Sequence, residues 1–406
     1  MSVKTLPGND KRPIERKKDA LRNTVIRHLY LKGPRTVAEI GHKLLVSLPT
    51  TLQLLNDLSA EGIIAKQGRG ESIGGRKPDL YGLQPRSFFV LAIDIDRHTT
   101  RLALFDNQNT QISDTLTIAF EASRDLTHLE TITQPALQLI RQSGIVLKRW
   151  VGVGVSMTGL VSAQDGRNFT YAAEGHVASL KEELESIFHK PVFIENDVKS
   201  AALAEYRFGL AHETRDALVI SLDWGLGLGI IMDGKLRRGA HGFAGEFGHI
   251  PLMEYGPLCS CGKTGCLETV ASGLALSRDA LQGLKSGQRT LLRERFRPEA
   301  DRIPLEAIIQ AALEGDQFSI QLLADTGRHL GKGVATLIQL FNPSLIVLSG
   351  VVAQAGPYIT LPLQQAIQTH SMRQLNQLTR IELSQLGNDA RLLGAVASVM
   401  ENKFNT

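Results

Sequence analysis

A strand–loop–strand pattern occurs twice in the body of the 406-residue chain and limits the folds that the chain can adopt. The first copy, FFVLAIDIDRHTTRLALFD, begins at Phe88, and the second, DALVISLDWGLGLGIIMDGKL, begins at Asp216. Helical patterns separate these copies from further apolar strand-like runs. Strands that alternate with helices indicate an α/β fold. Because the pattern is repeated, we expect two similar lobes with a cleft between them.

The charge of the chain is divided unevenly. Residues 1–90 hold 16 Lys and Arg against 8 Asp and Glu, whereas the remaining residues hold 29 against 33. The overall charge of +4 hides this difference. A basic front end joined to a slightly acidic body favours a polyanionic partner for the front end alone.

The front end has the pattern of a small helical module. Residues 1–17 are polar and are expected to form a flexible arm. A helix is expected from Lys18 to Gly33, a second from Thr36, which has Glu39 three residues later as in a capping box, and a third from Ser47. The expected buried stripe of the third helix is Leu52, Leu55 and Leu58.

Two short strand-like pieces around a basic loop follow these helices, so residues 18–85 are expected to form a winged helix-turn-helix that binds DNA. In such modules the third helix enters the major groove with its N-terminal residues first. Thr50, Thr51 and Gln53 are the expected base contacts, because Gln pairs with adenine and Thr contacts the thymine methyl. Arg76 and Lys77 are expected to reach phosphates or the minor groove. A helical interaction module with a solvated charged surface stays open as the alternative.

All three cysteines of the chain, Cys259, Cys261 and Cys266, lie close together, and His249 shortly precedes them. An odd number excludes complete disulfide pairing, and few cysteines in a long chain favour the cytoplasm. No signal-peptide pattern opens the chain, and no apolar run approaches the ~18 residues of a membrane span, so no membrane partner is expected. One imidazole and three thiolates are the ligands of a closed, structural zinc site. Three ordinary buried cysteines on a glycine-rich turn are the alternative.

Three motifs resemble the ROK family of bacterial sugar kinases and sugar-responsive repressors: IENDVKSAALAE, GFAGEFGH and CSCGKTGCLE. The resemblance covers nearly the whole chain. It implies that residues 86–406 form a duplicated actin-like (ribonuclease H-like) body that binds sugar in its cleft. The N-lobe would comprise about 86–198 and a C-terminal helix at about 390–406, and the C-lobe about 199–389. In this family the N-terminal winged helix occurs in the repressors, and members are dimers or tetramers.

The same resemblance implies a sugar site. Its Asn–Asp pair matches Asn196, which would contact sugar hydroxyls, and Asp197, which in the kinases is the general base. Glu246, His249 and Glu268 match further sugar contacts, and His249 would also bind zinc. The alternative is that Glu246 and Glu268 are solvated surface carboxylates.

The phosphate-binding loops of the kinases are not matched. Glycines in these loops let backbone N–H groups approach a phosphate, whereas carboxylates repel it. We therefore expect Asp197 to be vestigial as a catalytic base. Asp94 is kept, but Asp96, Arg97 and His98 stand at the positions of the first Gly-Gly-Thr loop, and Asp223 and Trp224 replace the first two residues of the second loop.

The sequence favours a cytoplasmic, sugar-responsive transcriptional regulator, and a repressor in particular. Its partners would be operator DNA and a sugar or sugar phosphate, and it would act as a homodimer or homotetramer. Two other interpretations stay open. One is an ATP-dependent hexose kinase with a DNA-binding arm, which would phosphorylate hexoses. The other is a zinc-stabilised interaction protein, whose DNA binding would not respond to sugar.

Overall fold

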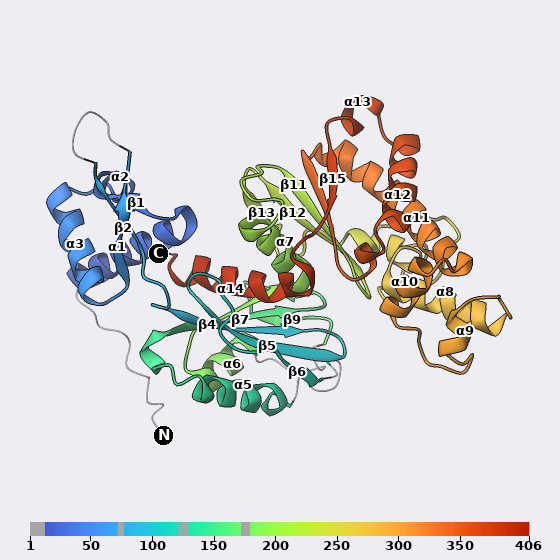
Figure 1. Cartoon of the computed structure of the whole chain (residues 1–406), viewed down its shortest axis with the longest axis horizontal. Helices are drawn as coiled ribbons and strands as arrows, with labels where there is room; N and C mark the ends of the chain where they lie inside the picture. The colour runs from blue at the N-terminus through green and yellow to red at the C-terminus, as the bar shows by residue number, and fades with distance from the viewer. Residues whose placement is uncertain (1–12, 72–76, 121, 123–127, 172–178, 406) are drawn as a thin grey trace, which may run out of the picture. The chain divides into compact units, whose positions relative to one another are not determined.

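The computed structural model describes residues 13–71, 77–120, 122, 128–171 and 179–405. The chain divides into two compact units. The first contains residues 1–155, 180–193 and 395–406, and the second contains residues 156–179 and 194–394. Figure 1 shows the front of the chain in blue and the end of it in red.

Three helices and a three-stranded antiparallel sheet, ordered β1-β3-β2, form the N-terminal part of the first unit (Figure 1). The first helix begins at Pro13, so the expectation of a flexible arm is wrong for residues 13–17, and residues 1–12 lie outside the described residues. The elements are α1 (Pro13–Lys32), β1 (Arg35–Thr36), α2 (Val37–Leu44), α3 (Leu48–Ala60), β2 (Ile64–Arg69) and β3 (Asp79–Leu83).

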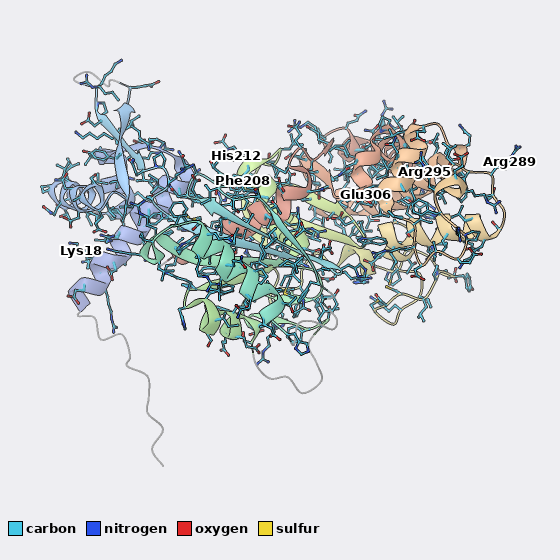
Figure 2. The ribbon with its side chains drawn as sticks, turned by 60° about the horizontal axis from the view of Figure 1, so that its bottom comes forward. Lys18, Phe208, His212, Arg289, Arg295 and Glu306 are labelled. Carbon is cyan, nitrogen blue, oxygen red and sulfur yellow. The ribbon has the colours of Figure 1, made fainter. Side chains whose placement is uncertain are left out.

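Local side-chain caps set where α2 and α3 begin. The Thr36 hydroxyl accepts the Glu39 N–H, and the Glu39 carboxylate accepts the Thr36 N–H, which confirms the capping box. The Ser47 hydroxyl accepts the Thr50 N–H at the start of α3. A contact between α1 and α3 joins the module: Lys18, labelled in Figure 2, forms an ion pair with Asp57 at 2.7 Å.

The buried face of α3 differs from the expected one. Leu55 and Leu58 are fully buried as expected, but Leu52 is 42% exposed and Leu54 is buried instead. The buried positions 51, 54, 55 and 58 follow the i, i+3, i+4, i+7 spacing of one helix face, and position 52 falls outside it.

The first unit also contains most of a five-stranded sheet ordered β10-β7-β4-β5-β6, and the last residues of β7 and β10 belong to the second unit. Helices α5 and α6 lie along one face of it and α14 along the other (Figure 1). The elements are β4 (Phe89–Ile95), β5 (Thr99–Asp106), β6 (Leu116–Ala119), α5 (Glu130–Gln142), β7 (Trp150–Met157), α6 (Leu180–Phe188), β10 (Val192–Asn196) and α14 (Ala390–Lys403).

The second unit contains a sheet ordered β13-β12-β11-β14-β15, which has the same topology as the first sheet. In each sheet the first three strands in sequence order lie side by side. The fourth strand pairs with the first, and the fifth pairs with the fourth at the edge of the sheet. This matches the repeat seen in the sequence. The strands are β11 (Ala217–Leu222), β12 (Leu226–Met232), β13 (Lys235–Arg237), β14 (Leu345–Ser349) and β15 (Arg380–Leu383), and a separate pair is β8 (Val161–Ser162) and β9 (Arg167–Asn168).

Helices cover both faces of the second sheet, so its central strands are apolar on both sides. Leu218 and Ile220 of β11 belong to the large core beneath α8, α10, α11 and α12, whereas Ala217 and Val219 pack with Ala202 of α7. The helices are α7 (Asp197–Phe208), α8 (Gly273–Lys285), α9 (Leu292–Arg295), α10 (Leu305–Leu313), α11 (Gln317–Phe341), α12 (Pro357–His370) and α13 (Arg373–Asn376).

Within the described ranges, none of the helices combines the length and the apolar character that crossing a membrane requires.

Candidate functional site

Asn196 and Asp197 lie where β10 passes into α7. The Asn196 Oδ1 atom accepts the N–H groups of Val198 and Lys199 and so caps the helix. Its Nδ2 atom donates to the Gly159 carbonyl at 3.0 Å and to Asp197 Oδ1 at 2.9 Å. The Asp197 carboxylate is therefore held by the residue that precedes it.

Glu246 stands on a turn that only glycine allows. Gly245 has φ +94°, and a Cβ atom there would lie 2.0 Å from the Leu228 carbonyl oxygen. The Leu228 N–H donates to the Gly245 carbonyl at 3.2 Å, so the turn lies directly against β12. This close approach sets the direction in which Glu246 leaves the backbone.

We expect Gly245→Ala to destabilise the chain by more than about 2 kcal/mol and to weaken ligand binding. Gly287→Ala is the matched control: its φ is +86°, but its nearest neighbour would be Arg293 Nη2 at 4.0 Å. An alanine with positive φ costs roughly 1–2 kcal/mol at either position. The difference in stability between the two variants therefore measures the clash of the added Cβ atom with Leu228. Chemical denaturation of both variants checks this, and equal losses of stability would contradict it.

The surroundings of Glu246 are charged. Partial loss of hydration raises the pKa of this carboxyl group above its ordinary value, and the negative charge of Glu268 adds to this, while Lys199 and His249 oppose it. Glu268 is fixed in turn, because its Oε2 atom accepts the Leu226 N–H at 3.0 Å. The second unit therefore brings both carboxylates and the imidazole into one electrostatic environment.

The sequence-predicted metal ligands come together. One ligand atom from each of His249, Cys259, Cys261 and Cys266 lies within 4.8 Å of the others. Cys259 Sγ is 3.5 Å from His249 Nδ1, and Cys261 Sγ is 3.6 Å from Cys266 Sγ. Tetrahedral zinc with bonds of about 2.3 Å to sulfur and about 2.0 Å to nitrogen separates two sulfurs by about 3.8 Å and a sulfur from a nitrogen by about 3.5 Å. These residues fit a metal ion of that size and geometry.

The cysteines differ in exposure. Cys259 and Cys266 are buried, whereas Cys261 is exposed. Burial, together with the neighbouring sulfur atoms of Cys261 and Cys259, raises the pKa of the Cys266 thiol to about 12. A bound cation would reverse this shift, because metals bind the thiolate form.

The His–Cys cluster connects the two segments that carry Glu246 and Glu268. The short 3-10 helix η2 (Phe247–His249) begins directly after Glu246 and ends at His249. Cys266 directly precedes the 3-10 helix η3 (Leu267–Thr269), which contains Glu268. The Leu267 N–H donates to the Ile250 carbonyl at 3.0 Å. An ion bound by the four ligands would hold η2 and η3 together.

Asp223 has a partner that the sequence analysis missed. Its Oδ2 atom lies 2.5 Å from Arg391 Nη2, and its Oδ1 atom accepts the Val351 N–H at 2.8 Å. Burial raises the pKa of Asp223, but Arg391 and the Val351 N–H outweigh burial and hold this pKa below its ordinary value. The same guanidinium nitrogen is 3.8 Å from Asp197 Oδ2. No motif around Arg391 signals this contact.

The segment that stands in place of the kinases' first phosphate loop, residues 94–98, belongs to the first unit. Asp94 is buried, and its Oδ2 atom accepts from Arg101 Nη2 at 2.7 Å. The Asp96 N–H donates to the Thr99 carbonyl, and the Arg97 N–H donates to the Asp96 carboxylate at 2.7 Å. The loop that contains His98 is therefore a tight turn that its own side chains stabilise.

One of the expected DNA contacts is wrong. Thr51 is fully buried: its hydroxyl donates to the Ser47 carbonyl, and a Cβ atom at Gly41 would lie 2.9 Å from it. Thr51 therefore packs α3 against α2 and does not face solvent. Thr50 and Gln53 are exposed as expected.

Lys77 is exposed, and Arg76 lies outside the described residues. The exposed face of α3 also carries residues that the sequence analysis did not select. Leu48 is 55% exposed and Leu52 is 42% exposed, and Asn56 is exposed too. Their spacing of four places them on one side of the helix. The helical period, applied with Thr51 as a buried residue, would have found them.

Comparisons with known proteins agree with this description. The family model for the ROK family matches residues 90–402. The DNA-binding transcriptional dual regulator NagC of Escherichia coli K12 is 28% identical over 376 residues, which cover 92% of this chain and 90% of that protein. The xylose repressor of Caldicellulosiruptor bescii is 29% identical over 362 residues, which cover 88% of this chain and 89% of that protein.

A solved structure extends the similarity to the fold. The crystal structure of a ROK family transcriptional regulator, a homolog of the E. coli MLC protein, superposes with a TM-score of 0.79 at 26% identity, covering 96% of this chain and 97% of that one. This chain belongs to the ROK family.

Proposed function

We propose that this chain is a sugar-responsive transcriptional regulator, and a repressor in particular. The observation that carries the proposal is the extent of the similarity. The match to NagC covers 92% of this chain, so it includes most of the basic front end as well as the body. Residues 18–85 would bind operator DNA, and residues 86–406, a duplicated actin-like body, would bind the effector.

The DNA-binding part would be a winged helix-turn-helix with α3 in the major groove. The polar side chains Thr50 and Gln53 would contact base edges, and the exposed Leu48 and Leu52 would contact thymine methyl groups. Lys77, on the β2–β3 hairpin, would contact phosphates together with its neighbour Arg76. The exposed apolar side chains of α3 favour this surface for base contacts.

The effector site would lie at the start of α7 and on η2 and η3. Carboxylates and amides suit the hydroxyl groups of a sugar, because they accept and donate several hydrogen bonds. Asp197 would hold a sugar hydroxyl without supporting efficient phosphoryl transfer, since transfer depends on stabilising charge around the phosphates. The sugar-binding residues would be Asn196, Asp197, Glu246, His249 and Glu268.

A structural zinc ion bound by His249, Cys259, Cys261 and Cys266 would keep Glu246 and Glu268 in position. His249 would bind it through Nδ1, which lies in the cluster, and would present Nε2 to the sugar. Zinc at this closed site would supply rigidity only.

The chain would act in the cytoplasm. It would form a homodimer or homotetramer, because a palindromic operator would require a DNA-binding protein with two-fold symmetry. Release of DNA requires the effector to bind the DNA-free conformation more tightly than the DNA-bound one.

DNA fragments selected by the full-length protein from a random library provide the test. We expect fluorescence polarisation to show release of the selected DNA by at least one of glucose, mannose, xylose, N-acetylglucosamine and their 6-phosphates. Asp197→Asn should weaken this response, because it removes a carboxylate acceptor. DNA binding that ignores every sugar would favour control by a protein partner. ADP release at the rate of ordinary kinases, abolished by Asp197→Asn, would favour the hexose kinase.

A further inference from the structure

We propose that the Asp223–Arg391 ion pair makes the effector site selective for unphosphorylated sugars. This inference rests on the sugar-binding role proposed above and adds a specificity-determining pair to it.

Three separate segments meet at Asp223. The residue follows β11, its Oδ1 atom accepts the Val351 N–H after β14, and its Oδ2 atom pairs with Arg391 at the start of α14. The backbone is engaged as well, since the Asp223 carbonyl accepts the Gly273 N–H at 2.7 Å. These contacts hold the Asp223 backbone in place and fix the direction of its carboxylate.

Arg391 connects this carboxylate to the sugar site. Its Nη2 atom is 2.5 Å from Asp223 Oδ2 and 3.8 Å from Asp197 Oδ2, and its side chain is 12% exposed. With the 6-hydroxyl of a sugar held by Asp197, a phosphate on that hydroxyl would lie beside this guanidinium group. The ion pair of Arg391 with Asp223 would then border the space that the phosphate needs.

The charges beside that hydroxyl disfavour a phosphate. Asp197 and Asp223 carry two negative charges against the single positive charge of Arg391. A phosphate group would add up to about two more negative charges. Solvent screens these partly buried groups less than exposed ones, so the repulsion between the carboxylates and a phosphate would be strong. A neutral hydroxyl adds no charge and can donate to Asp197.

Other described residues assigned to the sugar site bring further charges. Glu246 and Glu268 add carboxylates, and Lys199 acts on Glu246. Arg391 already has a carboxylate at ion-pair distance and would have to leave it to bind a phosphate.

Isothermal titration of the full-length protein with sugar and sugar 6-phosphate pairs tests the inference. The probes are glucose, N-acetylglucosamine, their 6-phosphates, and inorganic phosphate alone. For the pair whose parent sugar binds, we expect the 6-phosphate to bind at least about tenfold more weakly, or about 1.4 kcal/mol. Inorganic phosphate alone should not bind.

Asp223→Asn should reduce this discrimination about tenfold or more. The asparagine carbonyl can still accept the Val351 N–H, while the loss of negative charge leaves Arg391 available to a phosphate. The control is Asp233→Asn, which makes the same chemical change in an exposed ion pair with Arg215 at 2.9 Å. This control should discriminate as the unmodified protein does.

Two results would overturn the inference while the proposed function stands: a 6-phosphate that binds as tightly as its parent sugar, or an Asp223→Asn variant that binds sugars with unchanged discrimination. If that variant does not fold, the comparison of ligand pairs on the unmodified protein still decides. Failure of every sugar and sugar phosphate to bind would instead contradict the proposed function.

Discussion

Cys261→Ser is expected to abolish the proposed zinc binding and to lower the melting temperature by roughly 6–12 °C. Structural zinc contributes its binding free energy to folding, so the loss of one of four ligands should cost about 3 kcal/mol or more. In a unit of this size each kcal/mol corresponds to about 2–4 °C. Cys261 is the appropriate cysteine to change because it is exposed, so serine alters little packing. Elemental analysis and thermal unfolding with and without a chelator measure both effects.

Thr264→Ser, an equally exposed change in the same loop, is the control and should keep one zinc per chain. The variant without zinc should also lose sugar binding, because η2 and η3 would no longer be held together. A Cys261→Ser protein with one zinc per chain and an unchanged melting temperature would show that the four residues do not form the site.

Deletion of residues 1–85 is expected to weaken operator binding by about a thousandfold or more, to the level of non-specific binding or below. The deleted segment contains the face of α3 that we propose contacts bases and nearly all of the positive excess of residues 1–90, whereas the rest of the chain is slightly acidic. Polarisation assays at several salt concentrations measure this, because phosphate contacts make the affinity of the full-length protein fall as salt rises.

Sugar binding is the internal control for the deletion. All residues assigned to the effector site lie in the second unit, so the shortened chain should bind sugar as the full-length protein does. Operator binding that survives the deletion would show that the DNA-binding surface lies elsewhere in the chain.

Sequence patterns were sufficient where an interaction involves residues a few positions apart. The capping box of Thr36 and Glu39 and the cap at Ser47 formed as predicted, because each joins groups within one helical turn. The cluster of His249 with three cysteines also came together as predicted, because all four residues lie in one segment of the chain, residues 249–266. The repeated strand–loop–strand pattern predicted two similar lobes, and the structure has two five-stranded sheets of the same topology.

The family resemblance also came from the sequence, through motifs that are contiguous in the chain, and the family model matched residues 90–402. It selected Asn196 and Asp197, which the structure places at the start of α7. It did not indicate what Asp223 contacts, because a motif describes neighbours in sequence only.

Only the tertiary structure decided that Thr51 faces the core and which distant charges meet. Thr51 is buried because Gly41 lets α2 approach α3, and a contact between two helices is not visible in the pattern of either one. Asp223 and Arg391 are 168 positions apart and meet because the end of β11 and the start of α14 are brought together. The sequence by itself thus determined the local elements, the cluster of His249 with three cysteines, and the family. The packing of distant segments determined the ion pair to which we attribute the choice of effector.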